Sequence, residues 1–428
     1  MKKLIPFSFL LFMFTSATLS ASSLSPDRVD DLLKNSTSAD PLIADEAILE
    51  LRTIGQTALD AFVEKFKPGL EKGTYQENRM LLDIMDRIAG QHDSYFSGLF
   101  WHTDLPSAIQ TASESKKPIL SLRLLGKLTD EYSCANSRLF RSLLYSNTEI
   151  SSYLHDNYVL HWSSERPVPV VTIDYGDGRI MKTTLTGNSI HYIFTPAGTL
   201  VEAIPGLHSP DYFLSSLQRT DVFIADLINS GPDQQPAMIR LYHTGQLAGL
   251  RDLASKQQFP VAGRAVETRS VALLAERRTF SKMSIELPVM EKTGLVEASP
   301  ETGSAEQILL VSEDNRYRAM SAELGAGGEI DLSSRRMAVA KNPIRFGSET
   351  ELQKVLSKLS DRLCMETAKN ETEIHGYIHL WFSNGEFADW EKVNDRIYSE
   401  LFLTPQSDKW LGLYGEDVFT ALDQDGIQ

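Results

Sequence analysis

The chain has few of the residues on which disulfide-rich scaffolds and nucleic-acid-binding proteins depend. Only two of its 428 residues are cysteines, Cys134 and Cys364, so the fold must rest on hydrophobic cores instead of disulfide bonds. Basic residues are also scarce, because 42 lysines and arginines stand against 57 aspartates and glutamates. The resulting net charge of −15 makes nucleic acid and anionic membrane surfaces poor partners, since both attract lysine and arginine.

The sequence also lacks the motifs of nucleotide, calcium and serine-hydrolase chemistry. The glycine-rich run 325–328 has no Lys-Ser/Thr pair behind it, as a phosphate-binding loop requires. The turn at residues 176–178 has too few acidic neighbours for calcium, and no Gly-x-Ser-x-Gly elbow occurs. We therefore expect no cofactor.

The N-terminus has the layout of a secretory signal peptide. Lys2 and Lys3 precede an apolar run over residues 4–14, and small residues follow up to Ala21. A retained membrane anchor is the alternative, but the run is short for a bilayer-spanning helix. The sequence thus predicts removal of residues 1–21, a periplasmic or secreted location, and no stable membrane insertion after cleavage.

Residues 22–99 form a helical N-terminal region by their pattern. Apolar residues recur every three or four positions over residues 42–66, with Gly55 at a turn, and again over residues 78–89. One pair of helices resembles a HEAT-type hairpin. An ordinary helical bundle is the favoured reading, because solenoids need several repeats and no second copy is visible.

Residues 100–222 alternate between helices and strands, which is typical of an α/β domain. We predict helices at 106–115, 134–144 and 148–155 and strands near 116–125 and 157–162. Two hairpins follow at 170–185 and 191–204, and Ser209-Pro210 begins the last helix of this region.

Residues 223–428 are harder to assign and are predicted to be an α+β region of unknown fold. Helices are expected at 247–256, 352–365 and 386–402. Residues 297–307 have the composition of a loop, and residues 323–349 that of loops and short strands. The length and these three regions together predict a three-part α/β protein.

The middle region resembles the thioredoxin superfamily, closest to bacterial thioredoxin-like proteins. The matching residues are Trp101, the strand Lys117-Pro118-Ile119-Leu120, Cys134-Ala135-Asn136-Ser137 at a helix start, Tyr158-Val159-Leu160, and Phe194-Thr195-Pro196-Ala197-Gly198. The resemblance covers roughly a quarter of the chain. The signatures "CANSRxFR", "GDGR", "TGNSIHY" and "LTPxSDxWLGL" also resemble a narrower family of exported bacterial proteins of unknown function.

Two residues depart from the thioredoxin pattern. Ser137 stands where the family has the second cysteine of its Cys-x-x-Cys motif, and Ser189 stands where the family has a cis-proline. A cis bond before a non-proline residue costs about 3–4 kcal/mol, so the peptide before Ser189 is predicted to be trans.

The resemblance implies thiol chemistry at Cys134. A helix start and nearby arginines lower the pKa of a cysteine, and the thiolate is the reactive form. Ser137 would donate a hydrogen bond to the sulfur, Arg138 would support its charge, and Ser189 and His191 would face the substrate. Without a second cysteine such a centre exchanges disulfides only with a partner thiol. The first hypothesis is therefore a monothiol reductase or isomerase acting on other exported proteins or a small thiol.

The alternative is a non-catalytic protein-binding module on a thioredoxin scaffold, because fold alone does not give function. A disulfide between Cys134 and Cys364 is a further alternative, although a buried, inert Cys364 is the commoner case. His375 and His379 lie four residues apart, with Glu371 a turn earlier. In the absence of a third ligand in the sequence they are interpreted as structural histidines. The sequence does not indicate an oligomeric state.

Overall fold

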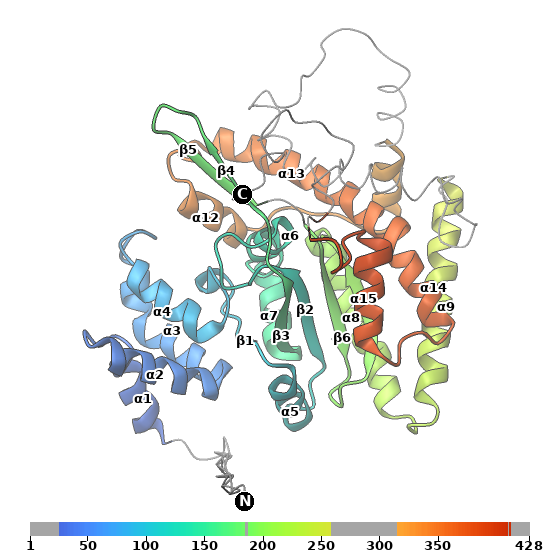
Figure 1. Cartoon of the computed structure of the whole chain (residues 1–428), viewed down its shortest axis with the longest axis horizontal. Coiled ribbons are helices and arrows are strands. Elements are labelled where there is room, and N and C mark those ends of the chain that lie inside the picture. The colour runs from blue at the N-terminus through green and yellow to red at the C-terminus, as the bar shows by residue number, and fades with distance from the viewer. Residues whose placement is uncertain (1–24, 185–186, 258–314, 410, 412–428) are drawn as a thin grey trace, which may run out of the picture.

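The computed structural model describes residues 25–184, 187–257, 315–409 and 411. The expected signal peptide at 1–21 and the expected loop at 297–307 lie outside these residues. The protein is a mixed α/β structure with a five-stranded sheet between an N-terminal group of helices and a C-terminal group (Figure 1). Within the described residues, no helix is both long and apolar enough to cross a membrane.

The N-terminal helices form a small core of their own. Asp40 caps the second helix and Gly55, at φ 85°, makes the turn that was predicted between the second and third. Leu51, Leu59 and Phe62 are fully buried in this core. The elements are α1 (Pro26–Asn35), α2 (Pro41–Ile54), α3 (Gln56–Leu70), α4 (Arg79–Ala89) and the short 3₁₀ turn η2 (Ser94–Phe96).

The central sheet has the strand order β1-β3-β2-β6-β7. Strands β1, β3 and β2 run parallel, whereas β6 and β7 are antiparallel to their neighbours. Every residue of β6 is buried, so both faces of the sheet are covered. The strands are β1 (Trp101–His102), β2 (Ile119–Leu125), β3 (Val159–Arg166), β6 (Ser189–Phe194) and β7 (Leu200–Pro205).

The helices of the middle region were largely predicted from apolar spacing. They are α5 (Leu105–Ser115), α6 (Ala135–Leu139), the π-helical η3 (Phe140–Leu144), α7 (Thr148–Asn157) and α8 (Pro210–Ile228). Both predicted hairpins are present. One joins β6 to β7, and the other, β4 (Val170–Asp174) with β5 (Ile180–Thr184), is a separate two-stranded sheet that projects from the body (Figure 1).

The C-terminal region is entirely helical where the structure describes it, so the α+β prediction is wrong for these residues. The short strands expected within 323–349 are replaced by a helix that Asp331 caps through the amide of Ser334. The segment is short and polar, so apolar spacing did not indicate a helix there. The elements are α9 (Gln235–Lys256), α12 (Leu332–Lys341), α13 (Glu349–Asn370), η4 (Glu371–His375), α14 (Gly376–Ser383), α15 (Trp390–Arg396) and η5 (Ile397–Leu401).

The C-terminal helices pack on the sheet through both polar and aromatic contacts. The Tyr192 hydroxyl of β6 donates to the Asn394 side chain of α15 over 3.0 Å. The rings of Phe194 and Trp390 meet edge to face at 5.9 Å. Helix α15 therefore covers one face of the sheet, and the residues of β6 and α15 belong to one continuous core.

An ionic cluster built around the buried Asp93 side chain joins the three parts of the chain. Asp93, whose side chain is 0% exposed, lies 2.8 Å from Lys341 Nζ of α12 and 3.9 Å from Arg141 of η3. His92 lies 2.6 Å from Glu131, which also binds Lys341. We call these residues (His92, Asp93, Glu131, Arg141 and Lys341) the Asp93 cluster.

Candidate functional site

Cys134 lies at the N-cap of α6, as predicted, but it is fully buried. The Cys134 amide donates to the Leu125 carbonyl at the end of β2, which fixes the cysteine beside the sheet. The side chain is 0% exposed and belongs to the main hydrophobic core. The sulfur therefore has no contact with solvent in this structure.

Burial raises the pKa of the Cys134 thiol. Hydrogen bonds from the backbone of Ser137 and Leu125 and the charges of Arg138 and Arg141 favour the thiolate, but they do not offset the loss of solvation. The prediction of a lowered pKa was therefore wrong. It considered the helix start, which is a local feature, and not the desolvation that the rest of the fold imposes.

Ser137 and Arg138 lie near the sulfur but act differently from the prediction. The Ser137 hydroxyl is buried and has no hydrogen-bond partner, so its backbone amide, and not its hydroxyl, supports the sulfur. Arg138 donates to the Thr184 hydroxyl over 3.1 Å, at the base of the β4–β5 hairpin. Thr184 in turn donates to the Ser133 carbonyl over 2.9 Å, so the hairpin is anchored next to Cys134.

Ser189 and His191 are buried within β6 and do not face solvent. The peptide before Ser189 is trans, as predicted, since no described peptide bond is cis. His191 Nε2 lies 2.6 Å from the Tyr145 hydroxyl, and burial, with His208 nearby, lowers the pKa of His191 to about 3. A neutral ring cannot stabilise a thiolate by charge, and neither Ser189 nor His191 has the exposure of a substrate-binding group.

The C-terminal region covers the end of the sheet that holds Cys134. The Asn188 side chain donates to the Phe402 carbonyl over 3.4 Å and to the Thr404 hydroxyl over 2.7 Å. The Tyr398 hydroxyl donates to the Asn188 carbonyl over 3.4 Å, and burial raises the pKa of Tyr398.

A small hollow remains beside this end of the sheet, and the C-terminal region forms much of its wall. It is lined by Ala135, Asn136, Gly187, Gly206, Glu366, Asn370, Ile374 and Phe402. The segment before Ser189, which the resemblance places next to the substrate, thus contacts the chain's own C-terminal region.

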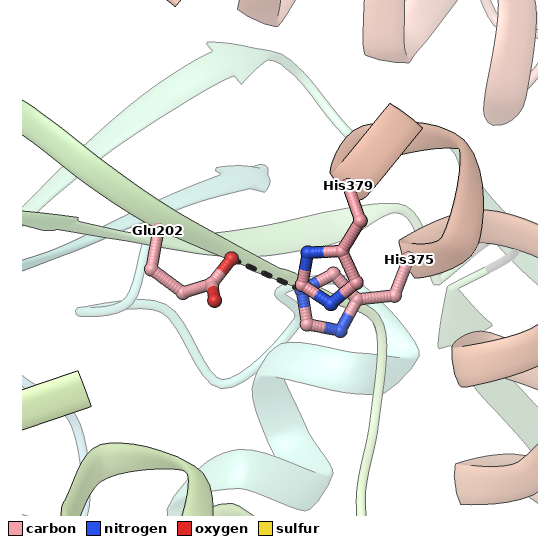
Figure 2. Close-up of side chains that lie close together, drawn as sticks. All are labelled: Glu202, His375 and His379. Atoms are coloured by element: carbon pink, nitrogen blue, oxygen red, sulfur yellow. Dashed lines mark hydrogen bonds and ion pairs between the residues drawn. The ribbon is translucent and has the colours of Figure 1, made fainter. Parts of the chain in front are cut away.

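A second group of chemically active side chains lies at the outer edge of β7. Glu202 of β7 faces His375 of η4 and His379 of α14, and Figure 2 shows the carboxylate beside the two imidazoles, whose planes are tilted by 32°. His375 Nε2 lies 3.1 Å from Glu202 Oε1, and its Nδ1 lies 2.9 Å from Glu371 Oε1. Both histidines lie on consecutive helical elements, η4 and α14.

Side chains of this group satisfy backbone atoms along the free edge of β7. His243 Nε2 of α9 donates to the Val201 carbonyl over 2.9 Å, and His208 Nε2 donates to the Pro205 carbonyl over 2.8 Å. The Ala203 amide donates to Glu202 Oε1 over 2.8 Å. An edge strand buried under helices needs such partners, because unpaired peptide groups are costly to bury.

The two buried carboxylates fix the charge state of His375. Burial alone would lower the pKa of this imidazole, but Glu371 and Glu202 outweigh it and raise the pKa to about 10. Burial would raise the pKa of Glu371, but His375 lowers it to about 2. His375 is therefore an imidazolium held between two carboxylates, which is a stable arrangement only because both of its N–H groups have partners.

Sequence reasoning found part of this second group and missed the rest. The spacing of His375 and His379 was visible, whereas Glu202 and His243 gave no signal because they lie far away in the chain.

The two cysteines do not form the disulfide that the sequence left open. Cys364 and Cys134 are both free thiols, and Cys364 Sγ donates to the Ala326 carbonyl over 2.7 Å. Comparison of the chain with protein-family models, with curated proteins and with solved structures finds no match.

Proposed function

We propose that the protein is an exported, non-catalytic binding module for other exported proteins, built on a thioredoxin-like scaffold. The observation that carries this proposal is the complete burial of Cys134, at an end of the sheet that the chain's own C-terminal region contacts. Monothiol exchange was the first hypothesis from sequence. It needs a thiolate that can reach a disulfide in solution, and a buried thiol with a raised pKa meets neither requirement.

The sheet supports the thioredoxin-like part of the proposal. Its order places the cysteine at the start of the helix that follows the central strand β2, with a strand, a hairpin and a helix after it. That is the order of elements on which the resemblance rests. The trans peptide before Ser189 and the missing second cysteine fit a scaffold that no longer carries out dithiol chemistry.

Alkylation of Cys134 distinguishes the two functions. In the mature chain with Cys364→Ser, we expect the native protein to resist iodoacetamide across pH 6–9 and to react fully once unfolded. The reason is that both the accessibility and the thiolate fraction of a buried cysteine are low. Modification of the native protein with an apparent pKa below about 8.5 would support disulfide exchange and overturn the proposal.

The β4–β5 hairpin is the element best suited to contact a partner. Val170 and Ile180 are 47% and 66% exposed, and the pairing of Val170 with Thr184 and of Asp174 with Ile180 places them on one face. Lys182 lies over the exposed ring of Tyr132, 4.5 Å from its centroid. A two-stranded sheet that exposes two large apolar side chains among polar ones is marginal in water, which favours a role in which a partner covers these side chains.

Site-specific photo-crosslinking tests this surface in the exporting cell. A photoreactive residue in place of Ile180 is expected to give discrete adducts with an exported protein, whereas the same residue in place of Leu241 gives none. Leu241 is a matched control because it is apolar and 73% exposed but lies on α9, away from the hairpin. Equal adducts at the two positions, or none at position 180, would refute the hairpin as the contact.

A further inference from the structure

The buried group at the edge of β7 has the composition of a metal site. Ligand atoms of Glu202, His375 and His379 all lie within 4.8 Å of one another, and the three residues are 3%, 2% and 3% exposed. Bonds of about 2.0–2.2 Å to a tetrahedral ion would place such atoms about 3.3–3.6 Å apart. The 3.1 Å between His375 Nε2 and Glu202 Oε1 is close to that spacing. The His379 ring lies with its centroid 3.9 Å from that of His375, so a rotation of the His379 side chain would bring its nitrogen to the same ion.

Each histidine is held by a second residue through its other ring nitrogen. His375 Nδ1 faces Glu371, and His379 Nδ1 lies 2.8 Å from His243 Nδ1. A carbonyl only accepts, so the bond to Val201 puts the His243 proton on Nε2 and leaves its Nδ1 to accept from His379. The lone pair of His379 is then on Nε2. Outer partners that fix the tautomer in this way are typical of metal-binding histidines.

The Asp93 cluster differs from the group at the edge of β7 because a lysine already neutralises its carboxylates. It also brings a histidine near two carboxylates, but Lys341 Nζ lies 2.8 Å from both Asp93 and Glu131 and supplies the cation itself. Glu202 instead has a hydrogen-bonding contact with the side chain of His375, and histidine is itself a common metal ligand. The β7 edge can therefore exchange a proton for a metal ion without displacing a lysine.

We propose that Glu202, His375 and His379 bind one divalent first-row transition-metal ion, such as zinc, with Glu371 and His243 orienting the two imidazoles. Imidazole and carboxylate ligands suit this class of ion. The ion replaces the proton on His375 Nε2 and takes its fourth ligand from water. Because the ligands come from β7, η4 and α14, the ion would tie the edge of the sheet to the C-terminal helices. This inference is independent of the proposed binding function.

Metal content and affinity test the proposal on the full mature chain. The protein produced in zinc-supplemented medium is expected to hold about one zinc ion per chain by mass spectrometry of the metal. After removal of the ion by a chelator, cobalt is expected to bind with the visible absorption of a four-coordinate site. Zinc, but not magnesium, is expected to raise the unfolding temperature of the metal-free protein, since binding to the native state alone stabilises it.

Paired variants locate the site. His379→Gln and Glu202→Gln are each expected to weaken zinc binding roughly 100-fold or more, because each removes one of three protein ligands. His92→Gln, in the Asp93 cluster, and His155→Gln, whose side chain is 40% exposed, are expected to retain the ion. Zinc binding that survives in both ligand variants, or is lost in His92→Gln alone, would overturn the assignment. If the ligand variants do not fold, the wild-type chain decides: less than about 0.1 ion per chain and no cobalt spectrum would refute the site.

Discussion

Replacing Asp93 with asparagine is expected to lower the free energy of unfolding by about 3–5 kcal/mol, since the change leaves a buried set of cations without their counter-charge. The Asp93 side chain is 0% exposed and accepts from Tyr75 Oη and Lys341 Nζ over 2.7 and 2.8 Å. Asparagine has nearly the same shape, and it tolerates the left-handed backbone at this position, φ 60°, as well as aspartate does. The substitution therefore removes charge with little change in packing or backbone preference.

A surface ion pair of the same region provides the control. Asp45 lies 2.6 Å from Arg87, but the two side chains are 53% and 51% exposed. Asp45→Asn should therefore cost less than about 1 kcal/mol. Urea unfolding near pH 6, followed by far-UV circular dichroism, measures both variants. A cost for Asp93→Asn no greater than that for Asp45→Asn would show that the cluster does not hold the three parts of the chain together.

Elements that depend on local pattern were predictable from the sequence. The helix Arg79–Ala89 and the strand Ile119–Leu125 follow from apolar spacing, and the turn at Gly55 follows from the freedom of glycine at positive φ. The helix Leu332–Lys341 was missed because it is short and polar, and it packs against other elements through few apolar side chains. Asp331, which caps this helix, is the residue in the sequence that could have indicated its start.

The environment of Cys134 was not predictable, because distant residues determine it. The helix start and the arginines that favour a thiolate are within eight residues of the cysteine, so they can be read from the sequence. The end of the sheet that holds the buried cysteine is contacted by Tyr398 and Phe402, which no local pattern connects to residue 134. Desolvation is the largest influence on this pKa, and it reverses the direction that local reasoning gives.

The same limit applies to the second candidate site. The spacing of His375 and His379 was visible in the sequence, but two histidines without a third ligand do not define a metal site. Glu202, the proposed third ligand, is brought to them by the pairing of β7 with β6 and by the packing of η4 on the free edge of β7. Both candidate sites thus depend on where the C-terminal helices meet the sheet.

The Asp93 cluster also predicts how stability changes with pH. Burial alone would lower the pKa of His92, but hydrogen bonds to Asp86 and Glu131 outweigh it and raise the pKa from 6.5 to about 9. A raised histidine pKa contributes stability that is complete below pH 6.5 and is lost as the pH rises to about 9. Asp93 and Glu131 have lowered pKa values, so their contribution is present at neutral pH and is lost in acid. The cluster should therefore stabilise the fold most between about pH 5 and 6.5.

The difference between the wild-type chain and His92→Gln isolates this effect, because other titrating groups cancel. We expect the wild type to be more stable by about 2–3 kcal/mol at pH 6, and this advantage to shrink to less than about 1 kcal/mol at pH 9.5. Urea unfolding of both proteins at half-unit pH intervals measures this difference in the free energy of unfolding. A constant difference across this range would mean that His92 is neutral in the folded protein. Lys341 would then be the cation that balances Asp93 and Glu131, and the link between the N-terminal helices and α12 would not weaken in mild alkali.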